Sequence, residues 1–200
     1  EGFMNMALNS IKEVDKAEMR EYTYRFFENV ATTLGEDFAV FLPTVTPFLL
    51  HTITSDEVLQ RVSRKTEFVF ESDDDEDDDF EEELDTAQYN FTVRTSQLDE
   101  RAAAVSALAA IALATRHHFS PYLEQSIKIF IEDANYFHYS VRRNVMNGLK
   151  NILYAAIPTA SKDMTYTYNE SQLALVHKIM MTFVTTMLED DDKETVATAC

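Results

Sequence analysis

The sequence predicts an all-α protein, built as an α-solenoid from about four stacked pairs of helices. Glycine occurs three times and proline four times in 200 residues, which argues against a turn-rich β fold. Long uninterrupted segments are rich in alanine, leucine, methionine, glutamate and phenylalanine, a composition that favours helix. Apolar residues recur in these segments at spacings of three and four, and an internal repeat of about forty residues indicates a solenoid.

The first part of the chain is expected to form three helices, over residues 3–12, 17–34 and 38–53. The inward face of the second helix is expected to carry Met19, Thr23, Phe26, Phe27, Val30 and Leu34. Gly35 stands where glycine commonly ends a helix. Pro43 and Pro47 are tolerated near the start of the third helix or kink it. A long irregular stretch, roughly 55–98, is expected to follow.

Five more helices are expected after this stretch, over residues 99–116, 121–131, 139–154, 171–188 and from 193 onward. The inward residues of the first and third of them are expected to be Val105, Leu108, Ile111 and Ala112, and Val141, Val145, Leu149, Ile152 and Leu153. Asp99 is expected to cap the first of the five helices, and Pro121 suits the first turn of the second. The alternating stretch Tyr89–Ser96 is expected to be extended and to anchor the far end of the irregular stretch.

The internal repeat is read from matching residues at fixed offsets. Arg101 and Arg142 are 41 residues apart, and at the same offset Leu108 matches Leu149. Arg20 and Arg101 are 81 apart, about twice that distance, which is explained if one repeat holds an insertion of about forty residues between its helices. The expected repeats are residues 1–36, 37–118 with the insertion at about 55–98, 119–158, and 159–200.

The insertion contains a block of acidic residues, 71–85, referred to below as the acidic block. Twelve of its fifteen residues are Asp or Glu and none is basic. Without these twelve carboxylates the formal charge of −18 would be −6, so most of the acidity of the chain is local. Like charges oppose compaction, so the block is expected to be a solvated loop that attracts cations.

Three arginines, Arg20, Arg101 and Arg142, recur at the start of the second helix of their repeats. Each is expected to reach an acidic turn group of a neighbouring repeat, so that together they form a structural ladder along the solenoid. Contact with a ligand is the alternative for each of them.

The layout of residues 119–158 resembles a HEAT repeat: an apolar helix ends in Glu132 and Asp133, and V-R-x-x-V opens the next helix after a short turn. An acidic loop within such a repeat resembles the importin-β (karyopherin-β) family of nuclear transport receptors. The flanking sequences FFENVATTLGEDFAVFLPTVTPFLL, YNFTVRTSQLDERAAAVSALAAIA and FSPYLEQSIKIF look most like the middle portion of the importers of ribosomal proteins and histones. The chain is accordingly expected to be a piece of a longer receptor.

The resemblance implies a receptor that binds basic cargo, gives it up when Ran-GTP displaces it, contacts nucleoporins through the full-length protein and shuttles between cytoplasm and nucleus. The residues expected to bind cargo or Ran are those of the acidic block: Asp73, Asp74, Asp75, Glu76, Asp77, Asp78, Asp79, Glu81, Glu82 and Glu83. Further contacts are expected on the concave face, from Glu21, Glu28, Asn144, Asn147 and Asn151. The alternatives are a solubilising spacer for the block and a solvated helix face for the other five residues.

Other functions find less support in the sequence. No constellation for an enzyme is visible, and no cofactor or metal is expected. His117 and His118 are adjacent, so on a helix they would point in different directions, and the five histidines are not spaced as a ligand set. A calcium loop starting at Asp73 would place Asp78 where glycine is needed.

The charge of −18 disfavours direct binding of nucleic acid, because it repels phosphate. No apolar run reaches the ~18 residues that cross a bilayer, so no membrane insertion is expected. The single cysteine, Cys200, excludes an intrachain disulfide and fits a reducing compartment. The remaining alternative is another HEAT scaffold, such as a phosphatase regulatory subunit or a chromosome-organising protein, with the acidic loop as a spacer.

Overall fold

The computed structural model describes residues 2–13, 16–55, 80–156 and 170–200, without the side chains of residues 80–94, 171 and 172. The described parts form helices joined by turns, and none of them is a strand. The elements are α1 (Gly2–Glu13), α2 (Ala17–Leu34), the 3₁₀ helix η1 (Gly35–Phe41), α3 (Leu42–Thr54), α5 (Phe80–Thr115), the 3₁₀ helix η2 (Arg116–Phe119), α6 (Ser120–Asp133), α7 (Tyr139–Ala156), α8 (Glu170–Glu189) and α9 (Lys193–Ala199).

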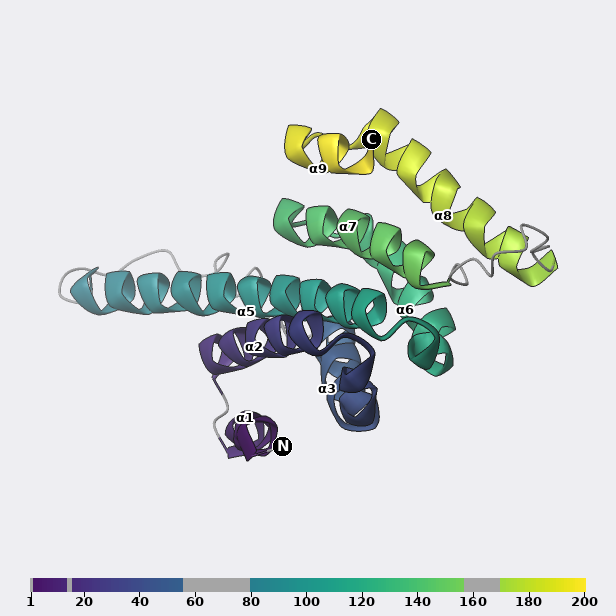
Figure 1. Ribbon diagram of the computed structural model, residues 1–200. Coiled ribbons are helices and arrows are strands. Elements are labelled where there is room, and N and C mark those ends of the chain that lie inside the picture. Colours follow the sequence, from purple (N-terminus) through teal and green to yellow (C-terminus); the bar gives the residue numbers. More distant parts are fainter. Residues whose placement is uncertain (1, 14–15, 56–79, 157–169) are drawn as a thin grey trace.

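These helices form consecutive pairs that stack in chain order, from α1 and α2 at one end to α8 and α9 at the other (Figure 1). The second helices of the pairs, α2, α5, α7 and α9, contact one another in succession, while α1, α3, α6 and α8 each contact the second helix of their own pair. The acidic insertion falls between α3 and α5, the two helices of the second pair. The prediction of an all-α HEAT solenoid with an insertion inside one repeat is therefore confirmed.

Helix α2 begins and ends where the sequence predicts, at Ala17 and Leu34. Gly35 ends it with a φ of 58°, a conformation that costs glycine little because it has no Cβ. The buried stripe contains Thr23, Tyr24, Phe27 and Ala31. Met19 and Leu34 were predicted to face inward but are 41% and 42% exposed, because they lie in the end turns of the helix, outside the buried stripe.

The third predicted helix starts later than expected. Residues 35–41 form η1, and the α-helix begins only at Leu42, with Pro43 in its first turn. Proline suits the first turn of a helix, where its missing N–H would have no partner, so Pro43 explains why the α-helix begins here. Pro47 lies inside α3.

The predicted irregular stretch is wrong over its last part, because α5 already begins at Phe80. Asp99 therefore lies inside a helix instead of capping one, and Tyr89–Ser96 is helical instead of extended. The segment contains no glycine or proline, and three glutamates in its first turn, at 81–83, suit the positive end of the helix dipole. The alternation at 89–96 was thus a poorer guide than the helix-forming composition around it.

The C-terminal half of α5 forms the centre of the core. Val105, Leu108, Ile111 and Ala112 are fully buried, as predicted. Many of the neighbouring residues are alanines that are also buried, because α2, α3 and α7 all pack around this part of α5. Small side chains let the surrounding helices approach closely, so α5 joins the first two repeats to the third.

Helices α6 to α9 match the predicted helices closely. Pro121 lies in the first turn of α6, and Val141, Val145, Leu149 and Ile152 of α7 are fully buried. Gly148 of α7 lies so close to α6 that a Cβ there would stand 2.5 Å from the Phe130 ring. The close packing of this pair therefore requires glycine at 148.

One stretch, Ala17–Thr54, is long and apolar enough to cross a membrane by length and composition, contrary to the expectation that no such run exists. It consists of α2, η1 and α3, and its large apolar residues Phe27, Phe38 and Leu49 are fully buried in the core. Core helices of globular proteins pass the same test, so this finding is weak support for a membrane span.

Candidate functional site

The first of the three repeated arginines, Arg20 of α2, binds Glu100 of α5. Its Nε donates to Glu100 Oε1 at 2.6 Å and its Nη2 donates to Oε2 at 3.0 Å. Both side chains are largely buried, at 19% and 7% exposed. The bidentate pair links the first repeat to the second across two helices, α2 and α5, that also pack through their apolar faces.

The second arginine, Arg101 of α5, binds Asp133 at the end of α6. Its Nη2 donates to Asp133 Oδ1 at 2.8 Å, its Nε donates to Oδ2 at 3.1 Å, and both side chains are 9% exposed. The guanidinium also stacks on the Tyr136 ring, with 4.3 Å between its central carbon and the ring centroid. Arg101 Nη1 donates to the carbonyl of Ser55, the last described residue before the insertion, at 3.2 Å.

The third arginine, Arg142 of α7, binds the turn between α8 and α9. It donates to the two carboxylate oxygens of Asp190 at 2.8 and 2.9 Å, and to Asp191 at 2.8 Å. Its Nη1 also donates to the carbonyls of Tyr136 and Phe137, at 3.0 and 3.2 Å. One side chain thereby holds the turn within the third pair of helices to the turn within the fourth.

The three arginines and their carboxylate partners are called the arginine ladder below. Each links one helix pair to the next, since Arg20, Arg101 and Arg142 lie on α2, α5 and α7 and their partners lie in the following pair. Two of the partners lie at a helix end or in a turn, whereas Glu100 lies inside α5. The repeat spacing in the sequence identified the three arginines but not their partners Glu100 and Asp190. A sequence signal for Glu100 was its position directly before Arg101.

The ladder carboxylates differ in their titration. Burial raises the pKa of Asp133 above its ordinary value, and the hydrogen bonds from Arg101 oppose this only in part. Hydrogen bonds from Arg142 instead lower the pKa of Asp190. Desolvation thus has the larger effect on the pKa of Asp133, whereas at Asp190 the hydrogen bonds from Arg142 outweigh it.

A cavity of about 230 Å³ lies between the Arg20–Glu100 pair and Arg101, beside Ser55 at the end of α3, where the insertion begins. Its lining includes Tyr24, Ser55, Gln97 and the guanidinium of Arg20. The Tyr24 hydroxyl lies 2.6 Å from Thr52 Oγ1, and burial raises the pKa of Tyr24 to about 12. Gln97 Oε1 is buried without a hydrogen-bond partner among the described residues. The cavity at the base of the insertion thus combines these polar groups with apolar side chains such as Ile11 and Phe48.

The predicted acidic site falls mostly outside the described residues. Asp73, Asp74, Asp75, Glu76, Asp77, Asp78 and Asp79 lie outside them altogether. Glu81, Glu82 and Glu83 lie in the first turn of α5, whose side chains are not described there. Their role in binding stays a prediction.

The predicted concave-face residues lie on α2 and α7, and several already have partners within the chain. Glu21 binds Arg25 one turn along α2, with 2.9 Å between Oε1 and Nε. Glu28 accepts a hydrogen bond from Ser106 Oγ at 3.0 Å. Asn144 Nδ2 donates to the carbonyl of Ala102 at 3.1 Å, which joins α7 to α5.

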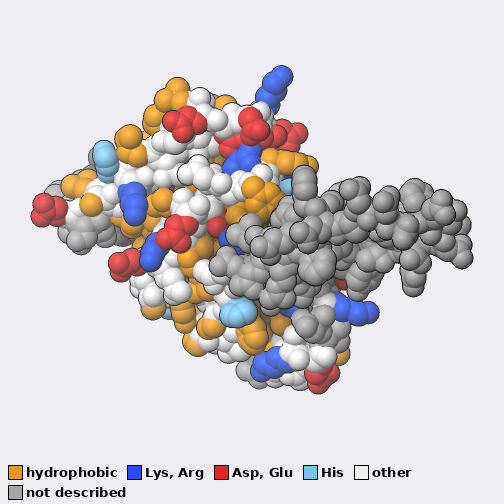
Figure 2. Space-filling model, turned by 180° about the vertical axis from the view of Figure 1, so that it is seen from behind, with side chains coloured by type: hydrophobic (Ala, Val, Ile, Leu, Met, Phe, Trp, Pro, Cys, Tyr) orange, Lys and Arg blue, Asp and Glu red, His pale blue; other side chains and the backbone are white. Residues whose placement is uncertain are grey.

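Of the remaining two, Asn147 is exposed and Asn151 is half-buried. On the face of the molecule drawn in Figure 2, acidic and basic side chains are interspersed over the described surface. The described surface on this side therefore has no large area of purely negative or purely positive charge. The acidic block differs, because all its charged residues are negative.

The expectation that His117 and His118 point in different directions is wrong. Both lie in the 3₁₀ helix η2, where their ring centroids are 3.9 Å apart, and Glu36 of η1 lies beside them. The preceding residue, Arg116, has a φ of 52°, which is rare for a residue with a Cβ and costs about 1–2 kcal/mol. No sequence signal marks this conformation at an arginine, so spacing could not reveal the cluster.

The chain was compared with known proteins. No protein-family model matches it. It is 26% identical over 144 residues to the probable importin subunit beta-4 of Schizosaccharomyces pombe (strain 972), a match that covers 68% of this chain. The similarity agrees with the all-α stack of helix pairs and with the insertion inside the second pair. The chain is thus similar, over about two thirds of its length, to a small part of an importin β subunit.

The relationship is distant, and the match covers only 13% of the length of the relative. The cargo, the regulation and the partners of the whole receptor belong to the proposal below.

Proposed function

We propose that this segment binds basic protein cargo, such as histone or ribosomal-protein tails, for a nuclear transport receptor regulated by Ran-GTP. The single observation that carries the proposal is the acidic block, twelve carboxylates in fifteen residues with no basic residue among them, inserted in a repeat of an importin-β-type solenoid. The segment acts by binding, without covalent chemistry. The full receptor contacts nucleoporins and shuttles between cytoplasm and nucleus.

Charge complementarity supports this function. Nuclear localisation segments and histone tails are rich in Lys and Arg, and a concentrated anionic segment speeds their encounter with the receptor. Each exposed ion pair contributes only a few tenths to about 1 kcal/mol, so affinity requires many pairs at once. The acidic block supplies carboxylates in the number that such binding needs.

The insertion that contains the block is tied at both ends to the repeat that carries it. Ser55, just before the insertion, is held by Arg101 of the ladder, and α5 continues from the insertion directly into the core. A cation bound to the block is thereby tethered to the second repeat by the chain on both sides. We include in the proposal that Glu21, Glu28, Asn144, Asn147 and Asn151 contribute further contacts along α2 and α7.

The competing function is that of another HEAT scaffold, such as a phosphatase regulatory or chromosome-organising protein, in which the acidic block is only a spacer. It predicts no selective affinity of the block for basic peptides. The two functions are therefore separable by charge changes at defined places.

The experiment is a titration of the chain with a fluorescent, lysine-rich histone-tail peptide, followed by anisotropy. In one variant Asp73, Asp74, Asp75, Asp77, Asp78 and Asp79 are changed to Asn. We expect its affinity to fall about 10- to 100-fold, because six exposed pairs are lost.

The matched control removes the same six charges elsewhere. Its changes fall on exposed carboxylates: Glu13→Gln, Glu18→Gln, Asp37→Asn, Glu124→Gln, Glu132→Gln and Glu170→Gln. We expect a small loss of affinity in the control, from the change in net charge alone. Equal losses in both variants would reject the block as the binding element and favour the spacer.

A further inference from the structure

The turns between repeats bring two imidazoles and a carboxylate together on the surface. Donor atoms of Glu36, His117 and His118 all lie within 4.8 Å of one another, and all three side chains are exposed. Glu36 lies in η1, between α2 and α3, whereas the histidines lie in η2, between α5 and α6. The cluster therefore joins two turns that are about eighty residues apart in the sequence.

The backbone places these side chains through two residues of positive φ. Gly35, with φ 58°, starts η1 directly before Glu36, and Arg116, with φ 52°, starts η2 directly before His117. The two 3₁₀ helices contact each other. The Arg116 guanidinium donates a hydrogen bond to the carbonyl of Tyr154 on α7, at 3.4 Å. The side chain of Arg116 is therefore bound to the third repeat.

Two imidazole nitrogens and one carboxylate oxygen are ligands that suit a borderline transition-metal ion such as Zn²⁺ or Co²⁺. Bonds of about 2.0–2.2 Å to a shared ion require the donors to lie closer together than 4.8 Å. All three side chains are exposed, so rotations about their side-chain bonds can bring the donors to such positions. Three protein ligands leave a fourth position of a tetrahedral ion open to water.

We propose that Glu36, His117 and His118 form a binding site for one Zn²⁺-type ion, which clamps the turn before the second repeat to the turn before the third. The ion stiffens the solenoid locally, because η1 and η2 then move as one unit. The site is separate from the acidic block and does not depend on the proposed cargo binding.

The experiment is a titration with Co²⁺, followed by its visible d–d absorption, on the full chain carrying Cys200→Ser. Excess Mg²⁺ is present throughout, because it occupies the carboxylates of the acidic block, which are hard oxygen ligands. We expect saturable absorption at one Co²⁺ per chain, displaced by Zn²⁺. His117→Ala/His118→Ala removes it, and Glu36→Gln weakens binding at least about tenfold, as losses around metal sites commonly do.

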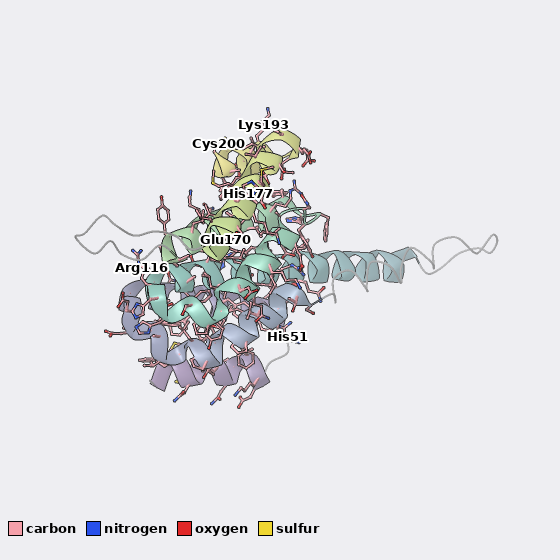
Figure 3. All side chains as sticks on the ribbon, turned by 90° about the vertical axis from the view of Figure 1, so that its right-hand side faces the viewer. His51, Arg116, Glu170, His177, Lys193 and Cys200 are labelled. Carbon is pink, nitrogen blue, oxygen red and sulfur yellow. The ribbon has the colours of Figure 1, made fainter. Side chains whose placement is uncertain are left out.

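The matched controls are Asp37→Asn, which removes the neighbouring exposed carboxylate, and His177→Ala on α8, which lies apart from Arg116 in Figure 3. Both should bind Co²⁺ as the parent chain does. Zn²⁺ should raise the unfolding temperature of the parent chain and leave that of His117→Ala/His118→Ala unchanged. Absence of saturable Co²⁺ binding, or binding and stabilisation that persist in the double variant, would overturn the proposal.

Discussion

The carboxylates of this chain fall into two groups with opposite relations to basic residues. In the arginine ladder, Glu100, Asp133 and Asp190 each receive two or more hydrogen bonds from an arginine. The acidic block has twelve carboxylates and no arginine or lysine of its own. A carboxylate that pairs with an arginine of the same chain therefore links helices of the fold. The carboxylates of the block have no such arginine among them and are expected to attract basic groups of a partner.

The difference teaches how an acidic chain can keep a defined fold while offering charge to a partner. Ladder carboxylates lie between repeats, where a guanidinium fixes both oxygens and the pair is largely shielded from water. Changes to the ladder should therefore alter stability, and changes to the block should alter binding. The following predictions test this separation, from the largest expected effect to the smallest.

The largest effect is expected from Arg101→Met, because Arg101 and its partner Asp133 are both buried residues. This variant leaves Asp133 as an uncompensated buried charge, and such losses cost about 3–5 kcal/mol in the free energy of unfolding. The double variant Arg101→Met/Asp133→Leu should recover much of this loss, because neither charge then remains. Urea unfolding of the three chains measures both effects, and a double variant no more stable than Arg101→Met would contradict the account.

Arg142→Met should cost less, about 1.5–3 kcal/mol, the range for hydrogen bonds to charged groups. The variant removes the contacts to Asp190, Asp191 and two carbonyls, but Asp191 remains exposed to water. Thermal unfolding should show the decrease. Arg25→Met, which breaks only the exposed pair with Glu21 on α2, is the control and should change little.

The two aspartates should respond oppositely to acid. Asp190 has a lowered pKa in the folded chain, so its ionised form stabilises the fold at pH values above the ordinary pKa of about 3.9. This stabilisation is lost as the pH falls through the lowered pKa of the folded state. Burial raises the pKa of Asp133, so its ionised form costs stability at neutral pH, and this cost disappears as the pH falls through the raised folded value.

Unfolding in urea between about pH 3 and pH 6 tests this opposition. Asp190→Asn should reduce the loss of stability on acidification, because the variant has no carboxylate to protonate at that rung. Asp133→Asn should steepen the loss, because it lacks the gain that protonation of Asp133 provides. The same pH dependence in both variants would show that the two rungs do not differ as described.

The smallest effect on stability is expected from the acidic block. Changing Asp73, Asp74, Asp75, Asp77, Asp78 and Asp79 to Asn should alter the free energy of unfolding by no more than about 0.5 kcal/mol, as surface changes commonly do. Relief of charge repulsion would act toward higher stability. A loss as large as that of Arg142→Met would mean that these residues also hold the fold.

Much of the fold could be predicted because its signals are local. The bounds of α2 follow from its apolar periodicity and Gly35, and the buried residues of α7 follow from their spacing. The start of α5 could not be placed, because the alternation at 89–96 imitates a strand. Local composition without glycine or proline was the better guide there.

The candidate sites were harder to predict because they join distant residues. The arginines of the ladder were found from their repeat spacing, but Arg20 and Glu100 are 80 residues apart and Arg142 and Asp190 are 48 apart. The cluster of Glu36, His117 and His118 depends on the positive φ of Arg116, a conformation that the sequence does not indicate at an arginine. Only the packing of the turns brings such residues together.

The most direct test of the separation is the affinity for one lysine-rich peptide, measured side by side for the parent chain, the six-residue block variant and Asp190→Asn. The account predicts a large loss of affinity for the block variant and near-parental affinity for Asp190→Asn at a temperature where it stays folded. Unchanged affinity in the block variant, or an equal loss on removing the single carboxylate of the ladder, would contradict it.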